Sequence, residues 1–168
     1  MTLSLVAPDP QLATHFLAMA REYETSEDEI DFRDALTDFN TYLVRTHEEQ
    51  RGLRAGRAPS FHFWLLDAAD VVGTARVRLQ LSPHLEREIG HIGYDVRPSK
   101  RGQGYGAKLF SLVLEAAREL GVSPVYVVCD SHNTASVAIV ERAGAQLLEE
   151  VLSNQTGAPI RRYSVAWR

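Results

Sequence analysis

The 168-residue sequence predicts one α/β domain of the α+β type over residues 1–168, with a mixed sheet of about seven strands and about four flanking helices. In four segments apolar residues recur at helical spacing, whereas seven shorter runs are continuously apolar or alternate with polar residues. Helical segments separate some of the predicted strands, and only such a connection permits parallel pairing. Hydrophobic residues make up 45% of the chain and charged residues 24%, which is typical of a soluble globular protein.

The first half begins with a short apolar run, residues 3–7, which predicts an edge strand closed by "PDP". Residues 10–24 predict a helix with Pro10 in its first turn, where a missing N–H is tolerated. Residues 31–50 predict a second helix, because they place apolar side chains on one face at Phe32, Leu36, Phe39 and Leu43. A basic, glycine-containing loop follows at residues 51–60.

Three strands are predicted next, at residues 61–67, 71–81 and 89–96. In the second of them, apolar residues alternate with polar ones, which predicts a half-buried strand. The apolar positions are Val77, Leu79 and Leu81, and the polar positions are Arg76, Arg78 and Gln80.

The second half begins with the clearest helix, residues 107–121, whose polar positions form one stripe. Residues 125–130, "VYVVCD", are continuously apolar apart from the last, as in the middle of a sheet. A short helix is predicted at residues 134–144, and a closing pair of strands at residues 145–152 and 160–167.

Composition narrows the function. The formal net charge of −4 argues against nucleic acid as the main partner. No apolar stretch approaches the length that spans a membrane, and the start of the chain lacks the pattern of a signal peptide, so a cytoplasmic location is predicted. Cys129 is the only cysteine and is expected to be a small buried hydrophobic residue. The histidines show no metal-binding spacing, and no metal is expected.

The stretch "HIGYDVRPSKRGQGYGAKLF" carries the strongest functional signal. Gly102, Gly104 and Gly106 lie between a predicted strand and the clearest helix, and glycine lets a ligand approach main-chain N–H groups closely. The first turn of a helix has unpaired N–H groups and a partial positive charge. Together with the basic residues just upstream, this pattern predicts a site for a phosphate or pyrophosphate group.

A dinucleotide-binding fold is one interpretation, because "GQGYGA" fits G-x-G-x-x-[GA] and Asp130 ends the next strand. Two features oppose it. In that fold the first glycine follows the strand directly, whereas here "RPSKR" intervenes. The residues after Asp130 are also too few to complete a doubly wound sheet. A nucleotide-binding oxidoreductase domain therefore stays a minor alternative.

A second interpretation explains the inserted basic residues. "RGQGYG" fits the [Q/R]-x-x-G-x-[G/A] signature of the GNAT superfamily of N-acetyltransferases, and "CDSHNTASVAIVERAGA" resembles that family's next strand and helix. The resemblance is to a bacterial branch of predicted acetyltransferases. It is strong over residues 89–145, and before residue 61 it depends only on the order of elements.

The resemblance implies that acetyl-CoA is the co-substrate and lies between two strands that splay apart. Main-chain groups of Tyr94, Asp95 and Val96 would bind its pantetheine arm. Asn133 and Ser136 fall on matching positions of the family motif and would contact the lower part of the cofactor. The resemblance implies that the pyrophosphate is held by the N–H groups of the loop residues, which are Arg101, Gly102, Gln103, Gly104, Tyr105 and Gly106.

The implied reaction is direct attack of a primary amine on the thioester in a ternary complex. The amine must first lose a proton, and Glu88, His91 and Tyr94 are the candidate catalytic residues on or beside the critical strand. His91 has the best-matched intrinsic pKa, although a hydrogen-bonded strand histidine is an equal alternative. Many family members place a general-acid tyrosine where this chain has Val140. A catalytically silent acyl-CoA-binding module is therefore the main rival.

The acceptor is expected to be an amine of a small molecule or a peptide. Five acids lie between Glu24 and Asp31, and near the acceptor cleft they would favour a cationic amine. Ser26 and Glu29 also have the spacing of a capping box, which explains the same acids structurally and is the preferred interpretation. A homodimer paired through the final strand is an open alternative.

Overall fold

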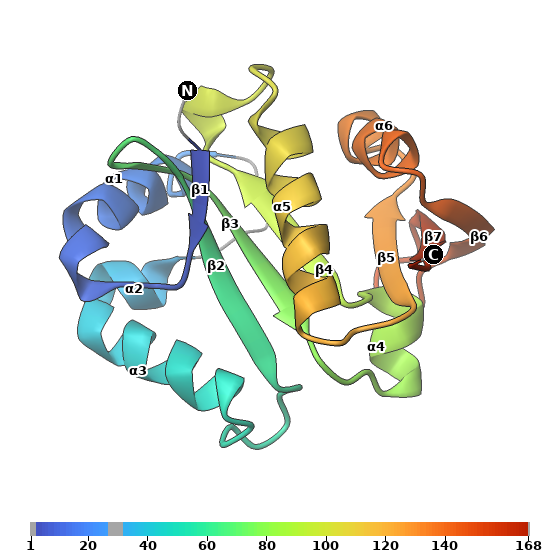
Figure 1. The fold of residues 1–168 in the computed structure, drawn as a ribbon, viewed down its shortest axis with the longest axis horizontal. Helices are drawn as coiled ribbons and strands as arrows, with labels where there is room; N and C mark the ends of the chain where they lie inside the picture. Colours follow the sequence, from blue (N-terminus) through green and yellow to red (C-terminus); the bar gives the residue numbers. More distant parts are fainter. Residues whose placement is uncertain (1–2, 27–31, 168) are drawn as a thin grey trace.

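The computed structural model describes residues 3–26 and 32–167. In these residues, seven strands form two antiparallel sheets, and six α-helices and two short 3-10 helices surround them (Figure 1). The strands are β1 (Leu3–Val6), β2 (Ser60–Asp67), β3 (Asp70–Arg78), β4 (Ile92–Val96), β5 (Val125–Asp130), β6 (Gln146–Leu152) and β7 (Pro159–Val165). The helices are η1 (Pro10–Leu12), α1 (Ala13–Tyr23), α2 (Arg33–Thr37), α3 (Phe39–Gln50), α4 (Pro83–Glu88), η2 (Pro98–Lys100), α5 (Tyr105–Glu119) and α6 (Thr134–Arg142).

The α+β class and the seven strands are confirmed, but the single mixed sheet of the prediction is wrong. One sheet has the order β1-β2-β3-β4 and the other the order β5-β7-β6. They meet at an isolated bridge between Gly90 and Val127, where the His91 N–H donates to the Tyr126 carbonyl at 2.7 Å. Beyond this bridge β4 and β5 belong to separate sheets, so they splay apart along the rest of their length.

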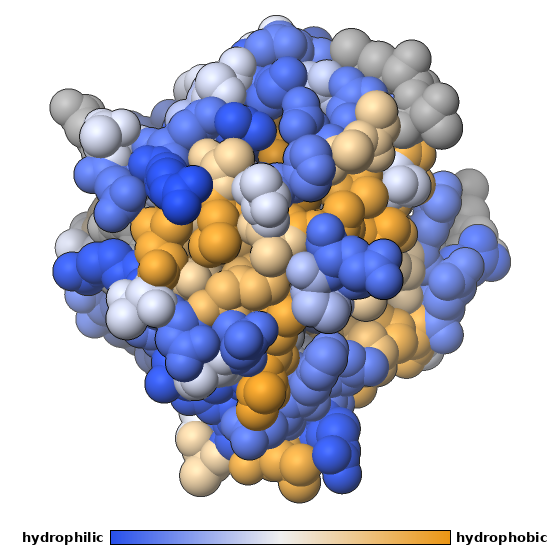
Figure 2. All heavy atoms as spheres, turned by 90° about the vertical axis from the view of Figure 1, so that its left-hand side faces the viewer, coloured by the Kyte–Doolittle hydropathy of each residue, from blue (hydrophilic) through white to orange (hydrophobic). Residues whose placement is uncertain are grey.

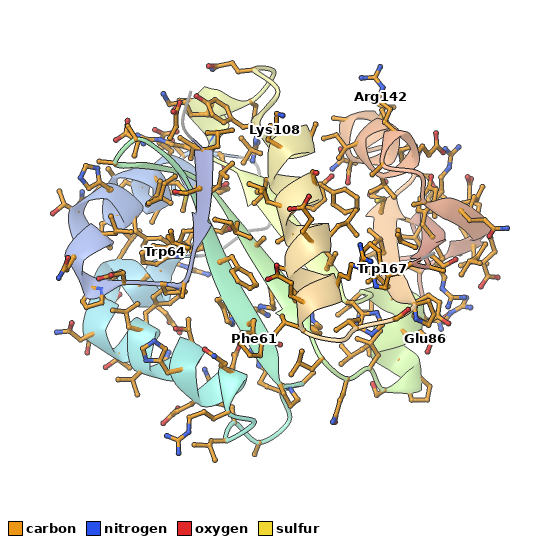
Figure 3. All side chains as sticks on the ribbon, in the orientation of Figure 1. Phe61, Trp64, Glu86, Lys108, Arg142 and Trp167 are labelled. Carbon is orange, nitrogen blue, oxygen red and sulfur yellow. The ribbon has the colours of Figure 1, made fainter. Side chains whose placement is uncertain are left out.

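Two hydrophobic clusters cover the two faces of the four-stranded sheet. Helix α5 packs on one face, where Leu109, Phe110 and Val113 contact the sheet residues Leu65 and Val77. The opposite face lies under α1, α2 and α3, and its cluster is strongly aromatic (Figure 1). Trp64 of β2 anchors that cluster by stacking on Phe16 with ring centroids 4.4 Å apart (Figure 3). The sheet is therefore held rigidly from both sides.

The predicted helix over residues 31–50 is wrong in its continuity. Asp38 interrupts it with an extended backbone, φ −148°, and its side chain accepts a hydrogen bond from the Thr41 N–H at 3.0 Å. An aspartate that caps α3 in this way satisfies an N–H that a helix start would leave unpaired. The apolar periodicity continues through the break, because α2 and α3 pack on the same cluster.

The strand predicted over residues 89–96 begins only at Ile92. Residues 89–91 connect it to helix α4 (Pro83–Glu88), which was not predicted. Ser82 caps α4 by accepting a hydrogen bond from the Leu85 N–H at 3.2 Å, and Pro83 occupies its first turn. Gly90 then takes a positive φ of 74°, and a Cβ there would lie 2.6 Å from the Tyr126 carbonyl. Only glycine permits this close approach of the two sheets.

The capping-box partner Glu29 and the acids of residues 27–31 lie outside the described residues. Among the described helices, none is both long and apolar enough to cross a membrane.

Candidate active site

The glycine loop forms an open cradle at the start of α5. Gly102 and Gly104 have positive φ values of 71° and 87°, and a Cβ added to either would meet no atom within 4 Å. The main-chain N–H groups from Gly102 to Gly106 donate to no acceptor among the described residues. These amides, at the positive end of a 15-residue helix, are arranged to bind an anion.

Gly106 has a different reason to be glycine. A Cβ at this position would lie 2.9 Å from the Ile139 side chain of α6, which is closer than real contacts allow. The third glycine therefore permits close packing of α5 against α6, whereas the first two supply the loop's conformation. Gln103 stabilises the loop by donating from its side chain to the Ser99 carbonyl at 3.1 Å.

Arg101 folds back on the strand instead of joining the open amides. Its N–H donates to the Pro98 carbonyl at 3.3 Å, and its guanidinium donates to the Val96 carbonyl at 3.0 Å and to the Asp95 carboxylate at 2.9 Å. Two of the predicted cofactor contacts, the Arg101 N–H and the Val96 carbonyl, are thus already paired within the protein. The set of open amides is reduced to Gly102–Gly106.

The free edge of β4 follows from its register. The His91 carbonyl and the Arg97 N–H both bond to β3, at 2.8 and 2.9 Å. Main-chain groups in an antiparallel pair alternate in direction, so Tyr94 and Val96 turn theirs toward the splay between the sheets. The same alternation turns the main chain of Asp95 to β3, and the register does not support a main-chain cofactor contact at that residue.

A cluster of hydroxyl and thiol groups bridges the splay. The Tyr94 hydroxyl lies 3.0 Å from the Ser136 hydroxyl in the first turn of α6. The Ser136 oxygen lies 3.4 Å from the Cys129 sulfur on β5. Burial raises the pKa of Tyr94 to about 12, and burial also raises the pKa of the Cys129 thiol, so both groups stay protonated at neutral pH. The sequence predicted a separate role for each of these three residues, and it did not predict that they cluster.

His91 links the two sheets through hydrogen bonds to Tyr126. Its Nδ1 accepts a hydrogen bond from the Tyr126 N–H at 3.0 Å, and its ring stacks on the Tyr126 ring. Burial and the nearby Arg78 lower the pKa of His91. A neutral imidazole that accepts at Nδ1 carries its proton on Nε2, so neither nitrogen is ready to take a proton. The role of His91 as general base stays a prediction, and this geometry does not support it.

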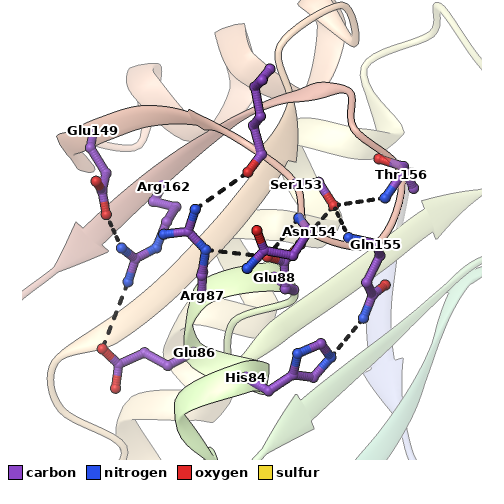
Figure 4. A network of polar contacts seen from close by, with 11 residues as sticks. His84, Glu86, Arg87, Glu88, Glu149, Ser153, Asn154, Gln155, Thr156 and Arg162 are labelled. Atoms are coloured by element: carbon purple, nitrogen blue, oxygen red, sulfur yellow. Dashed lines mark hydrogen bonds and ion pairs between the residues drawn. The ribbon is translucent and has the colours of Figure 1, made fainter.

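Glu88 lies at the end of α4, not on the strand, and fastens the turn between β6 and β7 (Figure 4). Its carboxylate accepts from the Ser153 hydroxyl at 2.7 Å and from the Asn154 N–H at 3.1 Å. These two hydrogen bonds hold the pKa of Glu88 below its usual range. The carboxylate is an anchored anion in a structural network, and its predicted catalytic role gains no support from this position.

The remaining predicted residues are placed as follows. Tyr105 directs its hydroxyl to the Asp67 carboxylate at 2.5 Å and is buried, so only its main chain belongs to the cradle. The Asn133 side chain caps α6 by accepting from the Ser136 N–H at 3.0 Å. Val140 is a residue of α6, and its side chain is fully buried in the core. The position of the family's usual tyrosine therefore holds no hydroxyl, as the sequence indicated.

A pocket of about 360 Å³ adjoins β4 on the face that α1, α2 and α3 cover. This volume suits a small ligand. The Asp95 side chain lies in it and accepts a hydrogen bond from the Tyr23 hydroxyl at 2.7 Å. Other lining residues come from β2, β3 and the helices, and include His62, Trp64, Arg76, Arg78, Phe32 and Tyr42. The amide cradle, the free strand edge and this pocket thus meet at β4.

Comparison with known proteins decides the family. The model of the acetyltransferase (GNAT) domain matches residues 3–146. The chain belongs to the GNAT acetyltransferase family. This confirms the resemblance inferred from the glycine loop, and it extends the match to the N-terminal region. No curated protein matches the sequence closely.

Solved structures of GNAT enzymes share this fold at low sequence identity. The ribosomal L7/L12 α-N-protein acetyltransferase RimL in complex with coenzyme A has a TM-score of 0.71 and 18% identity, over 99% of this chain and 94% of that one. The microcin C7 self-immunity acetyltransferase MccE in complex with acetyl-CoA and AMP has a TM-score of 0.73 and 14% identity, over 98% and 92%. A spermidine N-acetyltransferase chimera of SpeG from Vibrio cholerae and hSSAT has a TM-score of 0.64 and 15% identity, over 99% and 96%.

Proposed function

We propose that this GNAT protein is an N-acetyltransferase that moves the acetyl group of acetyl-CoA to a primary amine in a ternary complex. The observation that carries the proposal is the row of open amides from Gly102 to Gly106 beside the free edge of β4. The amides fit the diphosphate, and the outward main chain of Tyr94 fits an extended arm that pairs with it as an added strand would. Coenzyme A combines these two chemical features.

The pocket beside β4 would receive the acceptor. A primary amine is protonated at neutral pH, and the Asp95 carboxylate, which already accepts from Arg101 and the Tyr23 hydroxyl, lies near the strand edge as a further acceptor for the ammonium group. Proton loss from the amine then has to precede attack on the thioester carbonyl. A water relay to the open pocket supplies this step without a dedicated base. Holding both substrates at β4 contributes the entropic part of the rate acceleration.

Tyr94 is our candidate for the group that stabilises the departing thiolate. Its hydroxyl lies in the splay, bonded to Ser136, and its pKa of about 12 keeps it a hydrogen-bond donor at neutral pH. A thiolate has a lower proton affinity than a tyrosinate, so Tyr94 donates a hydrogen bond and keeps its proton. In this proposal Tyr94 provides the hydroxyl that Val140 lacks. The presence of this hydroxyl favours a catalytically active protein over a silent acyl-CoA-binding module.

A thiol-release assay with acetyl-CoA and a panel of amines tests the proposal. The panel contains polyamines, amino acids, aminoglycosides and peptides, and mass spectrometry identifies each product. We expect amine-dependent release and an acetylated amine. Coenzyme A should raise the melting temperature, whereas NAD should not. Acetyl-CoA binding without transfer to any amine would instead establish the silent module, and stabilisation by NAD alone would support the dinucleotide-binding alternative.

A further inference from the structure

The polar face of β3 forms the floor of the acceptor pocket. Thr74, Arg76 and Arg78 share this face, and all three line the pocket. The alternation in the sequence predicted the two arginines on the exposed side of a half-buried strand. The structure instead places both in the pocket, with Arg76 4.0 Å from Glu49 of α3, and both are only partly exposed. Viewed from the side of α2 and α3, hydrophobic residues show between hydrophilic ones (Figure 2).

Arg78 forms no close ion pair among the described residues, and Glu49 acts on it only at longer range. Its guanidinium donates to the Gly90 carbonyl at 3.3 Å, and it pairs with no carboxylate in the described ranges 3–26 and 32–167. Burial and the neighbouring Arg76 lower the pKa of Arg78 to about 10, which leaves it charged at neutral pH. A buried charge without a partner is destabilising. An anionic ligand would relieve that destabilisation.

Among the described residues, the Glu49 carboxylate is shared by several cationic or polar side chains at the Arg76 end of the pocket. Glu49 accepts from the His62 imidazole at 2.8 Å and lies 3.6 Å from Arg54 and 4.0 Å from Arg76. Burial lowers the pKa of His62, so this imidazole is neutral at pH 7. The single negative charge of Glu49 therefore offsets about one of the three positive charges of Arg54, Arg76 and Arg78. A net positive charge remains at the β3 floor.

The two ends of the pocket carry different side chains. At one end the Asp95 carboxylate is bound by Arg101 and the Tyr23 hydroxyl, and at the other end lie the Arg76 and Arg78 guanidinium groups. Asp95 lies opposite Thr74 in the β3–β4 register, whereas Arg76 lies opposite Gly93. With a strand spacing of about 4.8 Å and a rise of about 3.4 Å per residue, the Cα atoms of Asp95 and Arg76 are roughly 8 Å apart. Gly93 keeps the floor open between them, because a Cβ there would meet only the Arg78 guanidinium at 3.8 Å.

We propose that the acceptor carries an anionic group, a carboxylate or a phosphate, which Arg76 and Arg78 bind while its amine lies near Asp95. The inference rests on the proposed function and specifies its substrate class. The distance between the two ends favours an amine and an anion separated by more than the one carbon of an α-amino acid. Trp64, Tyr42 and Phe32 add aromatic surface, which suits an apolar body between the two polar groups.

The five acids between Glu24 and Asp31 would favour the opposite class of acceptor, a cationic amine, if they lay near the acceptor cleft. A matched pair of probes separates the two predictions. The compound 4-(aminomethyl)benzoate places an amine and a carboxylate at opposite ends of an aromatic ring, and 4-(aminomethyl)benzamide has the same shape without the charge. Spermidine represents the cationic class, and 3-aminopropyl phosphate tests phosphate against carboxylate.

The kinetic arm compares kcat/KM for these probes. Hydrogen bonds to a charged group contribute about 1.5–3 kcal/mol, so the wild-type protein should prefer the benzoate to the benzamide by about 10- to 150-fold. Arg78→Met and Arg76→Gln should lose this preference mainly through KM. Arg142→Gln, an exposed arginine on α6 that is labelled in Figure 3, should keep it. Equal or better turnover of the benzamide or of spermidine would overturn the inference.

A melting-temperature arm does not require turnover. With coenzyme A present, the benzoate should stabilise the wild-type protein more than the benzamide does, and Arg78→Met should abolish the difference. Without ligand, Arg78→Met should melt no lower than wild type, because it removes an unpaired buried charge. A lower melting temperature, or equal stabilisation by both probes, would contradict the proposal.

The two arms also distinguish failure of the anion site from failure of the proposed acetyl transfer. If the benzoate stabilises the wild-type protein but no amine is acetylated, the anion site stands and the proposed acetyl transfer fails. If spermidine is acetylated and the benzoate neither stabilises nor reacts, the acetyl transfer stands and the anion site fails.

Discussion

Gly104 and Gly121 offer a matched test of the amide cradle. They lie just before and just after the same helix, α5, both with positive φ (87° and 77°), and a Cβ at either would meet no atom within 4 Å. An alanine at each position should therefore strain the backbone by a similar amount, about 1–2 kcal/mol. For a domain of this length, that corresponds to a fall in melting temperature of roughly 2–8 °C.

The two variants should differ in their affinity for coenzyme A. At position 104 the new methyl group and the strained backbone disturb the N–H groups that face the diphosphate, whereas position 121 is at the far end of the helix. Loss of one hydrogen bond to a charged group, about 1.5–3 kcal/mol, corresponds to about 10- to 150-fold weaker binding. Isothermal titration calorimetry measures this directly. Equal affinities of Gly104→Ala and Gly121→Ala, with both folded, would refute the reasoning.

Three further predictions concern the candidate catalytic residues. Tyr94→Phe should lower kcat by about tenfold or more, the effect of losing one hydrogen bond to a charge, with little change in coenzyme A affinity. His91→Asn should keep most of kcat and its pH profile, since the amide oxygen replaces Nδ1, whereas loss of a true base would cost 10²–10⁴-fold. Glu88→Gln should lower stability at pH 7 but keep kcat. Because the folded pKa of Glu88 is depressed, its contribution to stability exists above pH 4.5 and disappears below it, as pH-dependent melting curves should show.

The local signals in the sequence predicted the parts of the site that are contiguous in the chain. The strand, glycine loop and helix from Ile92 to Glu119 form one continuous segment, and three alternate glycines constrain its shape. The helix break at Asp38 is also local, but the apolar periodicity did not reveal it. Helices α2 and α3 pack on one cluster, so their apolar residues keep the spacing of a single helix.

The contacts that the sequence did not predict join distant segments. The Tyr94 and Ser136 hydroxyls are 42 residues apart in the chain, and only the packing of α6 over the splay brings them together. The role of Arg78 was missed for a related reason. Alternation assigns a side chain to one face of a strand, but it does not show that helices from another part of the chain cover that face.

The most direct test of the cradle is amide NMR during titration with coenzyme A and, separately, with pantetheine, which lacks the diphosphate. We predict that coenzyme A shifts the amide signals of Gly102–Gly106 together with that of Tyr94, whereas pantetheine shifts Tyr94 and leaves the loop signals in place. Saturation by coenzyme A with the loop signals unmoved would contradict the account.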